Sequence, residues 1–408
     1  MGLQDLIDLT QKQFKKKKPD SDVEAKLAKD EKPPTGLIVD NPLLELILDR
    51  RFLAYGRSYL TYGKKGSAKT STFYEIAKIF QRNGGDVIWI ETEHAADLEY
   101  AKKQGVDTDR MVIVHPDSIE EALTLAEMYI RNMTKAYPDG DTPVLICLDS
   151  IAGSALEDEI DSSHSITDVT IGKHARLLSQ FYREMDKPLA NEKCIFLALN
   201  QLKVAVGAKG YGEDAQDAMI GGNAPLFHST YQFKMKLKTQ MVAANEHGAE
   251  RKVGSRHIIE CKRNKLGREG KGQVIEVDCY IDGGMDWWSP LVRKLGDEYG
   301  TIVKKSSGGW YTWQTPNTHY EVIDEEGNKS LEVIDTEKTY RESELAAIIM
   351  RSTEAKELIR KAFGIPDLPS EEEVKEVEAE RKNKRKKKKA TLTEDEDNST
   401  SRTKALTI

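Results

Sequence analysis

One eight-residue segment constrains the fold of this chain more than any other. It reads Gly-Lys-Lys-Gly-Ser-Ala-Lys-Thr at positions 63–70, follows a predicted strand at Ser58–Tyr62 and opens a helical pattern at Thr70–Arg82. A glycine-containing loop between a strand and a helix can wrap phosphate groups with its backbone N–H groups and the helix N-terminus. The segment departs from the usual P-loop pattern only at Ala68, where glycine is normal. This context predicts a phosphate-binding loop in an α/β domain.

The polar positions of the loop have definite roles in this interpretation. Lys69 would reach the β- and γ-phosphates of a nucleotide, and the Thr70 hydroxyl would coordinate Mg²⁺. Ala68 adds a methyl group where the chain passes closest to phosphate, and it disfavours a positive φ. The alternative is a lysine- and glycine-containing turn with no ligand. Further nucleotide contacts are expected from Gly63, Gly66, Ser67, Ala68 and Ser71.

An acidic residue at the end of a second apolar run belongs to the same site. Val144–Leu148 is entirely apolar and is followed directly by Asp149. Because α/β proteins bind ligands at the carboxyl ends of parallel strands, Asp149 is expected to hold Mg²⁺ there together with Thr70. The alternative is an N-cap aspartate after an ordinary buried strand, and the presence of both segments in this order favours the metal site.

A third polar group, Glu91-Thr92-Glu93-His94, ends the strand that follows the loop helix. Either acid could activate water for attack on the γ-phosphate, and we prefer Glu93. A solvated strand-end glutamate is the alternative. His94 is interpreted as structural because no second ligand lies at metal-binding spacing.

The chain divides into four predicted regions: a short helix and linker at 1–36, a core at 37–284, a small C-terminal α/β domain at 285–368 and a charged disordered tail at 369–408. Alternating strand and helix patterns in the core predict a mostly parallel sheet flanked by helices. From about Thr230 onward, apolar residues alternate with lysines, which predicts an antiparallel extension with one wet face. The expected parallel strands are Ser58–Tyr62, Asp86–Glu91, Val112–His115, Val144–Leu148 and Cys194–Asn200.

Composition limits the class of protein only weakly. The net charge is −7, but acid gathers at Glu371–Glu380 and base at Lys384–Lys389, so the total does not exclude nucleic-acid binding. No apolar run is long enough to span a membrane. The four cysteines have no metal-binding spacing, and we expect buried, reduced thiols in a cytosolic protein.

Two long stretches follow strand ends of the predicted sheet, at Gly153–Thr170 and Lys203–Ile220. Their backbone amides, with Lys203 and Lys209, could follow nucleic-acid phosphates without reading sequence. Arg176 is a further candidate phosphate contact. Ordinary surface loops and a solvated helix-surface arginine are the alternatives.

At these positions the chain resembles the RecA family of recombinases, and within it the UvsX proteins of T4-like phages. The likeness runs in the family's order from about Leu53 to Tyr311, and several motifs in register make it specific. Besides the loop at 63–70, it is carried by Ile90–Asp97, Tyr100–Lys103, Asn200-Gln201, Gly221–Ala224 and Arg263–Lys265.

The resemblance implies a RecA-like P-loop ATPase core that uses ATP and Mg²⁺. It implies that Glu93 is the general base and that Gln201 senses the γ-phosphate and signals to the DNA-binding segment. It further assigns the adenine contacts to Asp97 and Tyr100, the cations that reach a neighbouring subunit's ATP to Arg263 and Lys265, and DNA contacts to Gly221, Gly222 and Asn223.

The function implied is an ATP-dependent recombinase that forms helical filaments on single-stranded DNA and pairs it with double-stranded DNA. The N-terminal helix would mediate self-association, and the implied partners are a phage single-stranded-DNA-binding protein and a loading mediator. The implied location is the cytoplasm, that of the host if the chain is phage-encoded. Two alternatives stay open: a ring-forming DNA helicase of the same fold, and a non-enzymatic DNA-binding scaffold, which Ala68 favours.

Overall fold

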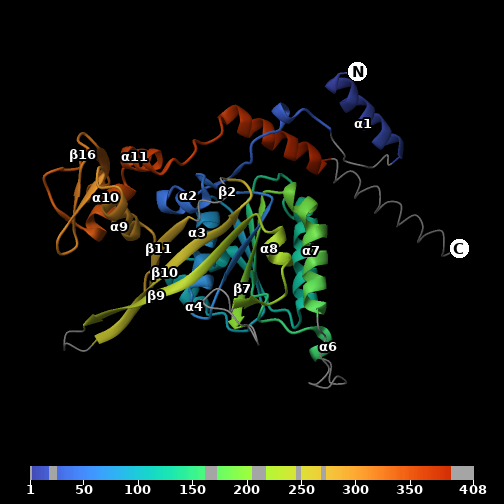
Figure 1. Cartoon of the computed structure of the whole chain (residues 1–408), viewed down its shortest axis with the longest axis horizontal. Helices are drawn as coiled ribbons and strands as arrows, with labels where there is room; N and C mark the ends of the chain where they lie inside the picture. Colours follow the sequence, from blue (N-terminus) through green and yellow to red (C-terminus); the bar gives the residue numbers. More distant parts are fainter. Residues whose placement is uncertain are drawn as a thin grey trace.

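The computed structural model describes residues 2–17, 25–160, 172–204, 217–244, 250–267 and 273–386. Within these residues the core is a ten-stranded sheet in the order β12-β11-β10-β9-β3-β7-β6-β4-β5, with β8 added to β7 (Figure 1). The parallel part of this sheet confirms the predicted α/β fold. Its strands are β3 (Arg57–Gly63), β4 (Asp86–Glu91), β5 (Met111–Val114), β6 (Val144–Asp149) and β7 (Cys194–Val204).

The register of the parallel strands brings the candidate site residues to one edge of the sheet. Glu91 at the end of β4 lies opposite Asp149 at the end of β6. Gly63 at the end of β3 lies opposite Gln201 on β7. Because parallel strands end on the same side, segments far apart in sequence meet there.

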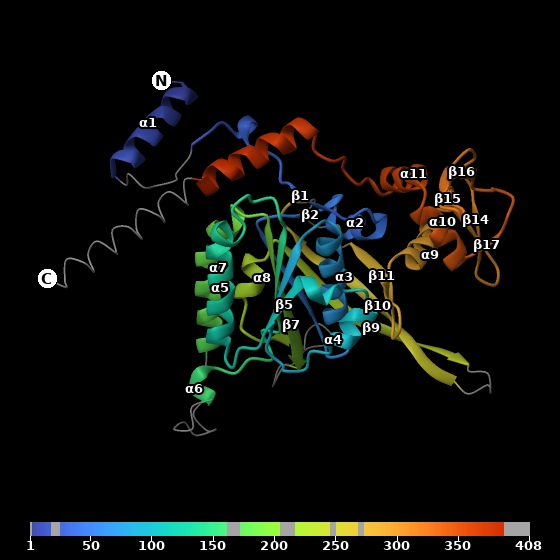
Figure 2. The same ribbon diagram turned by 180° about the vertical axis from the view of Figure 1, so that it is seen from behind.

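Helices cover both faces of the sheet. On one face lie α3 (Lys69–Arg82) and α4 (Leu98–Lys103), and Phe73 and Phe80 of α3 are fully buried against the strands. On the other lie α5 (Ile119–Ala136) and α7 (Lys173–Ala190), whose apolar faces form a second core cluster (Figure 2). Short elements complete the core: η1 (Ala28–Asp30), η2 (Thr108–Arg110), α6 (Glu157–Ile160), β8 (Asp217–Met219) and α8 (Ala224–His228).

The predicted antiparallel extension is present as β9 (Tyr231–Ala244), β10 (Glu250–Asn264), β11 (Val274–Tyr280) and β12 (Gly284–Asp286). Its distal part forms the hairpin that projects from the core in Figure 1. The expectation of one wet face is wrong for the first five residues of β9, where both faces are buried and Lys234 is only 5% exposed. This part of β9 pairs with β3 on one side and β10 on the other, so it lies inside the sheet.

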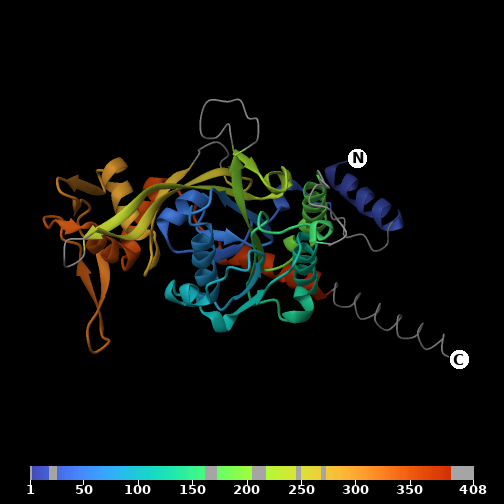
Figure 3. The same ribbon diagram turned by 90° about the horizontal axis from the view of Figure 1, so that it is seen from below.

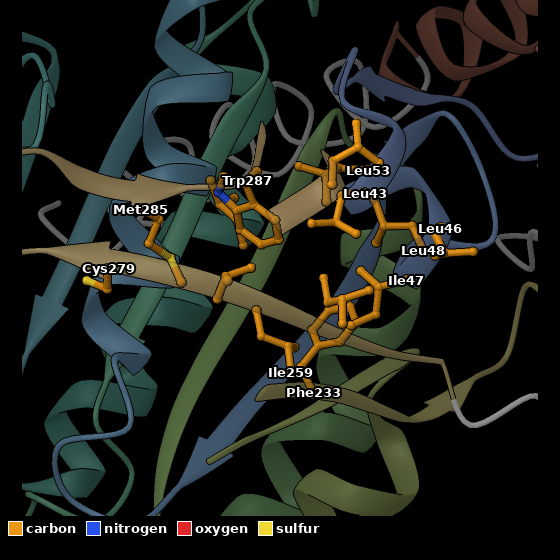
Figure 4. Packing of buried hydrophobic residues seen from close by; sticks show 14 of the residues in the cluster. Leu43, Leu46, Ile47, Leu48, Leu53, Phe233, Ile259, Cys279, Met285 and Trp287 are labelled. Carbon is orange, nitrogen blue, oxygen red and sulfur yellow. The ribbon is translucent and has the colours of Figure 1, made fainter. Parts of the chain in front are cut away.

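A short helix closes the core beside this extension. α2 (Pro42–Leu48) begins at Asn41, whose side chain accepts hydrogen bonds from the next two helical N–H groups. Its leucine and isoleucine side chains pack with Phe233, Ile259 and Trp287 from the sheet and the chain that follows it (Figure 4). The antiparallel strands β1 (Gly36–Ile38) and β2 (Phe52–Ala54), which α2 connects along the chain, form a two-stranded sheet beside the helix.

The C-terminal domain mixes helices and strands, as predicted. An ion-pair network fixes it to the core: Arg360 of this domain donates two hydrogen bonds to Glu45 of α2, which is fully buried. The domain contains α9 (Trp288–Glu298), β13 (Val303–Ser306), β14 (Trp310–Trp313), β15 (His319–Ile323), β16 (Lys329–Val333), β17 (Tyr340–Arg341), α10 (Glu342–Met350) and α11 (Thr353–Phe363).

The region predicted as a disordered tail contains a helix at residues 371–386, drawn in red across the core in Figure 1. Arg385 of this helix is 5% exposed and forms a 3.0 Å ion pair with Glu192. Arg381 lies over the ring of Tyr55. The prediction of disorder is therefore wrong for 371–386, because docking to the core orders a sequence too polar to form a core of its own.

The N-terminal helix α1 (Leu3–Lys17) agrees with the predicted short helix. It lies at the opposite end of the molecule from the C-terminal domain (Figure 3). Leu3, Leu6 and Leu9 are 70%, 47% and 43% exposed. This helix therefore presents an apolar stripe to solvent.

Two further observations concern the cysteines and the possibility of a membrane-spanning helix. All four cysteines are buried and free, as expected. Among the described residues, no helix combines the length and apolar character needed to cross a membrane.

Candidate nucleotide-binding and catalytic site

The 63–70 loop joins a strand to a helix as its sequence predicts, although its backbone takes a positive φ at Ala68, which the methyl group disfavours. Ala68 adopts the left-handed conformation at φ +63°, and Gly66 has φ +78°. A Cβ at Gly63 would lie 2.3 Å from the carbonyl oxygen of Met235, so only glycine fits there. The buried Ser67 hydroxyl finds no hydrogen-bond partner within the described part of the chain. A phosphate oxygen would supply one, so the loop suits a phosphate ligand.

Lys69 lies inside this loop. Its ammonium donates to the carbonyl oxygens of Gly63 at 3.2 Å and Lys64 at 3.1 Å. Burial lowers the pKa of Lys69, while the negative charges of Asp149 and Glu93 oppose this change. The ammonium is thus held beside the loop backbone, where a bound phosphate would complement its charge.

The predicted magnesium ligands meet each other. The Thr70 hydroxyl donates to Asp149 Oδ2 at 3.0 Å. Burial raises the pKa of Asp149 to about 7, with the Glu93 and Glu91 charges adding to the effect and the Thr70 hydrogen bond opposing it. A bound divalent cation would stabilise the negative charge of this buried carboxylate. One hydroxyl and one carboxylate suit Mg²⁺, which keeps waters and phosphate oxygens as its other ligands.

The carboxylate of Glu93 receives two hydrogen bonds on one oxygen. Ser150 Oγ and Gln201 Nε2 each donate to Glu93 Oε1 at 2.7 Å. Gly153 closes one side, since a Cβ there would lie 2.5 Å from Glu93 Cγ. The structure therefore joins two predicted residues, Glu93 and Gln201, that are 108 positions apart.

Sequence reasoning missed Ser150, although it follows Asp149 directly. Its hydroxyl donates to Glu93 and accepts from the backbone N–H of Gly153 at 3.2 Å. Its position after the strand-end aspartate was the available signal. The register between β4 and β6, which only the fold supplies, brings it to Glu93.

The predicted adenine residues lie at the start of α4. Asp97 is the N-cap and accepts from the N–H of Tyr100 at 2.8 Å. The Tyr100 ring lies 6.2 Å from that of Tyr74 on α3. Burial raises the pKa of Tyr100, and a hydrogen bond with Ser71 opposes this. This geometry joins α4 to the loop helix, and the contacts with adenine stay predictions.

Arg263 and Lys265 do not lie at the loop of their own subunit. Arg263 on β10 pairs with Gln232, which pairs in turn with Leu60 in the middle of β3, three residues before the loop begins. Lys265 donates to the carbonyl oxygens of Phe227 and His228 at 2.8 and 2.7 Å. If Arg263 and Lys265 contact a nucleotide, it must therefore be one that another subunit binds.

The candidate DNA residues lie on and around β7 and α7. Arg176 and Lys203 are exposed, as is Asn223 at the start of α8, and Lys209 lies outside the described residues. Gly221 has φ +81°, and a Cβ there would lie 2.3 Å from Leu178 Cδ1. Packing against α7 by itself explains this glycine, whatever its role toward DNA.

Comparison with known proteins decides the family. The model of the RecA N-terminal domain matches residues 34–285. The chain belongs to the RecA family. It is 31% identical over 293 residues to Protein RecA of Frankia casuarinae, covering 71% of this chain and 77% of that protein. It is 32% identical over 285 residues to Protein RecA of Saccharopolyspora erythraea, covering 69% and 73%.

The membership agrees with the geometry of the loop and the sheet. RecA proteins are DNA-dependent ATPases that act in recombination and repair, and this general activity extends to the chain. The match to the model of the RecA N-terminal domain ends at residue 285, so the C-terminal domain and the helix at 371–386 lie outside that model.

Proposed function

We propose that this RecA-family ATPase forms helical filaments on single-stranded DNA and promotes homologous pairing and strand exchange with double-stranded DNA. The proposed setting is phage recombination, repair and recombination-dependent replication in the host cytoplasm, with a single-stranded-DNA-binding protein and a loading mediator as partners. The overall resemblance of the chain to the recombinases of T4-like phages supports this setting, whereas the motifs at Ile90–Asp97 and Gly221–Ala224 are those of the RecA family as a whole.

At the proposed site, ATP supplies the phosphoryl group and Mg²⁺ offsets its charge. Backbone N–H groups of the 63–70 loop and Lys69 would hold the phosphates, and Thr70 and Asp149 would hold the cation. Glu93 would accept a proton from the attacking water. Its position beside Ser150 and Gln201 supports this role, because their hydrogen bonds orient the carboxylate.

The observation that carries the proposal is the 2.7 Å hydrogen bond between Glu93 and Gln201. Gln201 lies on β7, which continues through Lys203 into the proposed DNA segment. The neighbouring Asn200 donates to the carbonyl oxygen of Ile220 at 2.8 Å, next to Gly221. A change at the γ-phosphate that moves Gln201 would therefore reach both ends of this segment. Such coupling requires ATP and ADP to favour different arrangements.

Two apolar surfaces support self-association. One is the exposed stripe of α1 formed by Leu3, Leu6 and Leu9. The other is a groove of about 590 Å³ between the edge strand β5 and α5, where Val112 and Met128 are exposed. Helix α1 of one subunit would fill this groove on the next, because exposed apolar faces are stabilised by covering each other. Arg263 and Lys265 would then act on the neighbour's ATP.

Steady-state ATP hydrolysis with and without single-stranded DNA tests the proposal, using wild type, Glu93→Gln and the exposed control Glu99→Gln. We expect DNA to stimulate wild type and the control. We expect Glu93→Gln to lose turnover by a factor on the order of 10²–10⁴ while it still binds DNA. Turnover retained in Glu93→Gln would refute its role as the base.

Electron microscopy and a strand-exchange assay test the assembly. Open filaments with strand exchange would support the recombinase. Closed rings that unwind DNA would instead identify a helicase of the same fold. If wild type binds DNA but hydrolyses no ATP under any condition, the scaffold alternative would replace the proposal.

A further inference from the structure

Glu91 is a buried carboxylate with no place in the scheme above. It is the last residue of β4 and is 3% exposed. Its Oε1 accepts from the backbone N–H of Glu93 at 2.9 Å and from that of Ala95 at 3.4 Å. One buried side chain thus holds the main chain on both sides of His94.

A second contact fixes Glu91 from the neighbouring strand. His115 follows the edge strand β5, and its Nδ1 lies 3.1 Å from Glu91 Oε2. The ring of His115 stacks on that of His94, with centroids 5.5 Å apart and planes at 28°. His94 has φ +50°, an unusual conformation for a residue with a side chain. The turn at 93–95 is therefore held by its hydrogen bonds to Glu91 and by the stacking of His94 on His115.

Both carboxylate oxygens of Glu91 have partners, the turn on one side and His115 on the other. A glutamine of the same shape has one acceptor oxygen and an NH₂ group where the carboxylate has two acceptors. The carboxylate accepts from the turn with one oxygen and, when His115 Nδ1 carries a proton, from His115 with the other. A glutamine would keep the second contact only if His115 changed to its other tautomer.

The turn held by Glu91 aims the Glu93 carboxylate. That carboxylate meets Ser150 and Gln201 at 2.7 Å each, so a small shift of the backbone at 93 would break both hydrogen bonds. Misplacing a reacting group by about 1 Å can cost about 10²-fold in rate. We propose that Glu91 and His115 are positioning residues that hold the 93–95 turn and thereby keep Glu93 aimed at the water it activates; this inference rests on the proposed role of Glu93.

The test measures ATP turnover of the full chain with saturating single-stranded DNA. Glu91→Gln is expected to lower kcat by about 10- to 100-fold, leaving KM for ATP within about two-fold. His115→Ala should lower kcat in the same direction, and His115→Gln, which keeps a donor for Glu91, should restore most of the rate. The exposed Glu99→Gln serves as the matched control. A rise in KM at unchanged kcat would overturn the proposal.

A double-mutant cycle separates positioning from a general structural effect. Single-turnover hydrolysis of labelled ATP by excess protein measures the slow rates of variants that carry Glu93→Gln. If Glu91 acts through Glu93, Glu91→Gln will reduce the rate much less in the Glu93→Gln background than in wild type. An equal reduction in both backgrounds would overturn the inference and leave Glu93 as the base. If Glu91→Gln does not fold, the same cycle with His115→Ala decides the question. A full rate in Glu93→Gln alone would instead refute the proposed role of Glu93 as the base, on which this inference rests.

Discussion

The Thr70 hydroxyl donates a 3.0 Å hydrogen bond to Asp149 although the two residues are 79 positions apart. Thr70 lies in the first turn of α3, and Asp149 ends β6. Since β3 and β6 both pair with β7, the loop after β3 and the end of β6 reach the same edge of the sheet. The proposed cation site therefore depends on the sheet order as much as on its two ligands.

This contact predicts different results for two substitutions at Thr70. Thr70→Ser keeps the hydroxyl and should retain turnover within about ten-fold. Thr70→Val has nearly the same shape but no oxygen, and it should lower Mg²⁺-dependent turnover by about 10²-fold or more, since the lost ligand stabilises charge in the transition state. A titration of turnover against Mg²⁺ concentration checks this. Equal activity of the two variants would remove Thr70 from the cation site.

The left-handed conformation of Ala68 predicts the effect of glycine there. This conformation costs a non-glycine residue roughly 1–2 kcal/mol, while glycine adds unfolded-state entropy of about 0.4–1 kcal/mol. Ala68→Gly should therefore raise the free energy of unfolding by about 0–1.6 kcal/mol, and the variant should hydrolyse ATP at least as fast as wild type. Ala68→Val should lose nucleotide affinity, because a branched side chain fits this conformation poorly. Thermal melts and fluorescent-nucleotide binding measure both effects.

The ion pair between Arg360 and Glu45 predicts a large loss of stability. Glu45 is fully buried, so Arg360→Met leaves an unpaired charge and should cost about 3–5 kcal/mol. Joint replacement with Glu45→Leu should recover a large part of this loss, since the buried charge of Glu45 is then removed as well. Urea unfolding monitored by tryptophan fluorescence compares the variants. Additive losses in the double variant would contradict this account.

The helix at 371–386 gives a prediction with a neighbouring control. Arg385 pairs with the buried Glu192 and donates to the carbonyl oxygen of Met133 at 3.1 Å. Arg385→Ala should lower the free energy of unfolding by about 3–5 kcal/mol, because it removes the cation that faces the buried Glu192 carboxylate. The exposed Lys386→Ala should change it by no more than about 0.5 kcal/mol. Equal melting temperatures of the two variants would show that the helix does not dock in solution.

His257 predicts a pH dependence of stability. It is 1% exposed, and burial lowers its pKa to about 4, aided by the charge of Lys252 and opposed by that of Asp278. Between about pH 6.5 and pH 4 the unfolded chain binds a proton here that the folded chain does not. This residue should therefore reduce stability as pH falls through that window, by at most about 1.4 kcal/mol per pH unit. The melting temperature of wild type should therefore fall relative to that of His257→Gln as pH decreases toward 4. A difference in melting temperature that does not change with pH would contradict the assignment.

Local patterns in the sequence predicted the elements that carry the site. Strand patterns between turn residues predict β3, β4, β6 and β7 to within a few residues of their ends. The glycines and the lysine of the 63–70 segment predict the phosphate-binding loop. The acids at 91, 93 and 149 each follow an apolar run. These features are decided by neighbours in the chain, so hydrophobic periodicity and loop chemistry reveal them.

The contacts between distant segments were decided by tertiary structure alone. No local pattern distinguishes Lys234, buried within the sheet, from the exposed Lys238 on the same strand. The helix at 371–386 has the composition of a disordered tail and is ordered by the groups it meets on the core. Likewise, Glu91 can hold the backbone at Glu93 only because the chain after β4 turns back toward the Glu91 side chain. β5 in turn places His115 beside Glu91. Local sequence patterns therefore predict most of the polar side chains of the site. Packing and strand order decide which of them meet, and they add Ser150 and His115, because burial and hydrogen bonding depend on the whole fold.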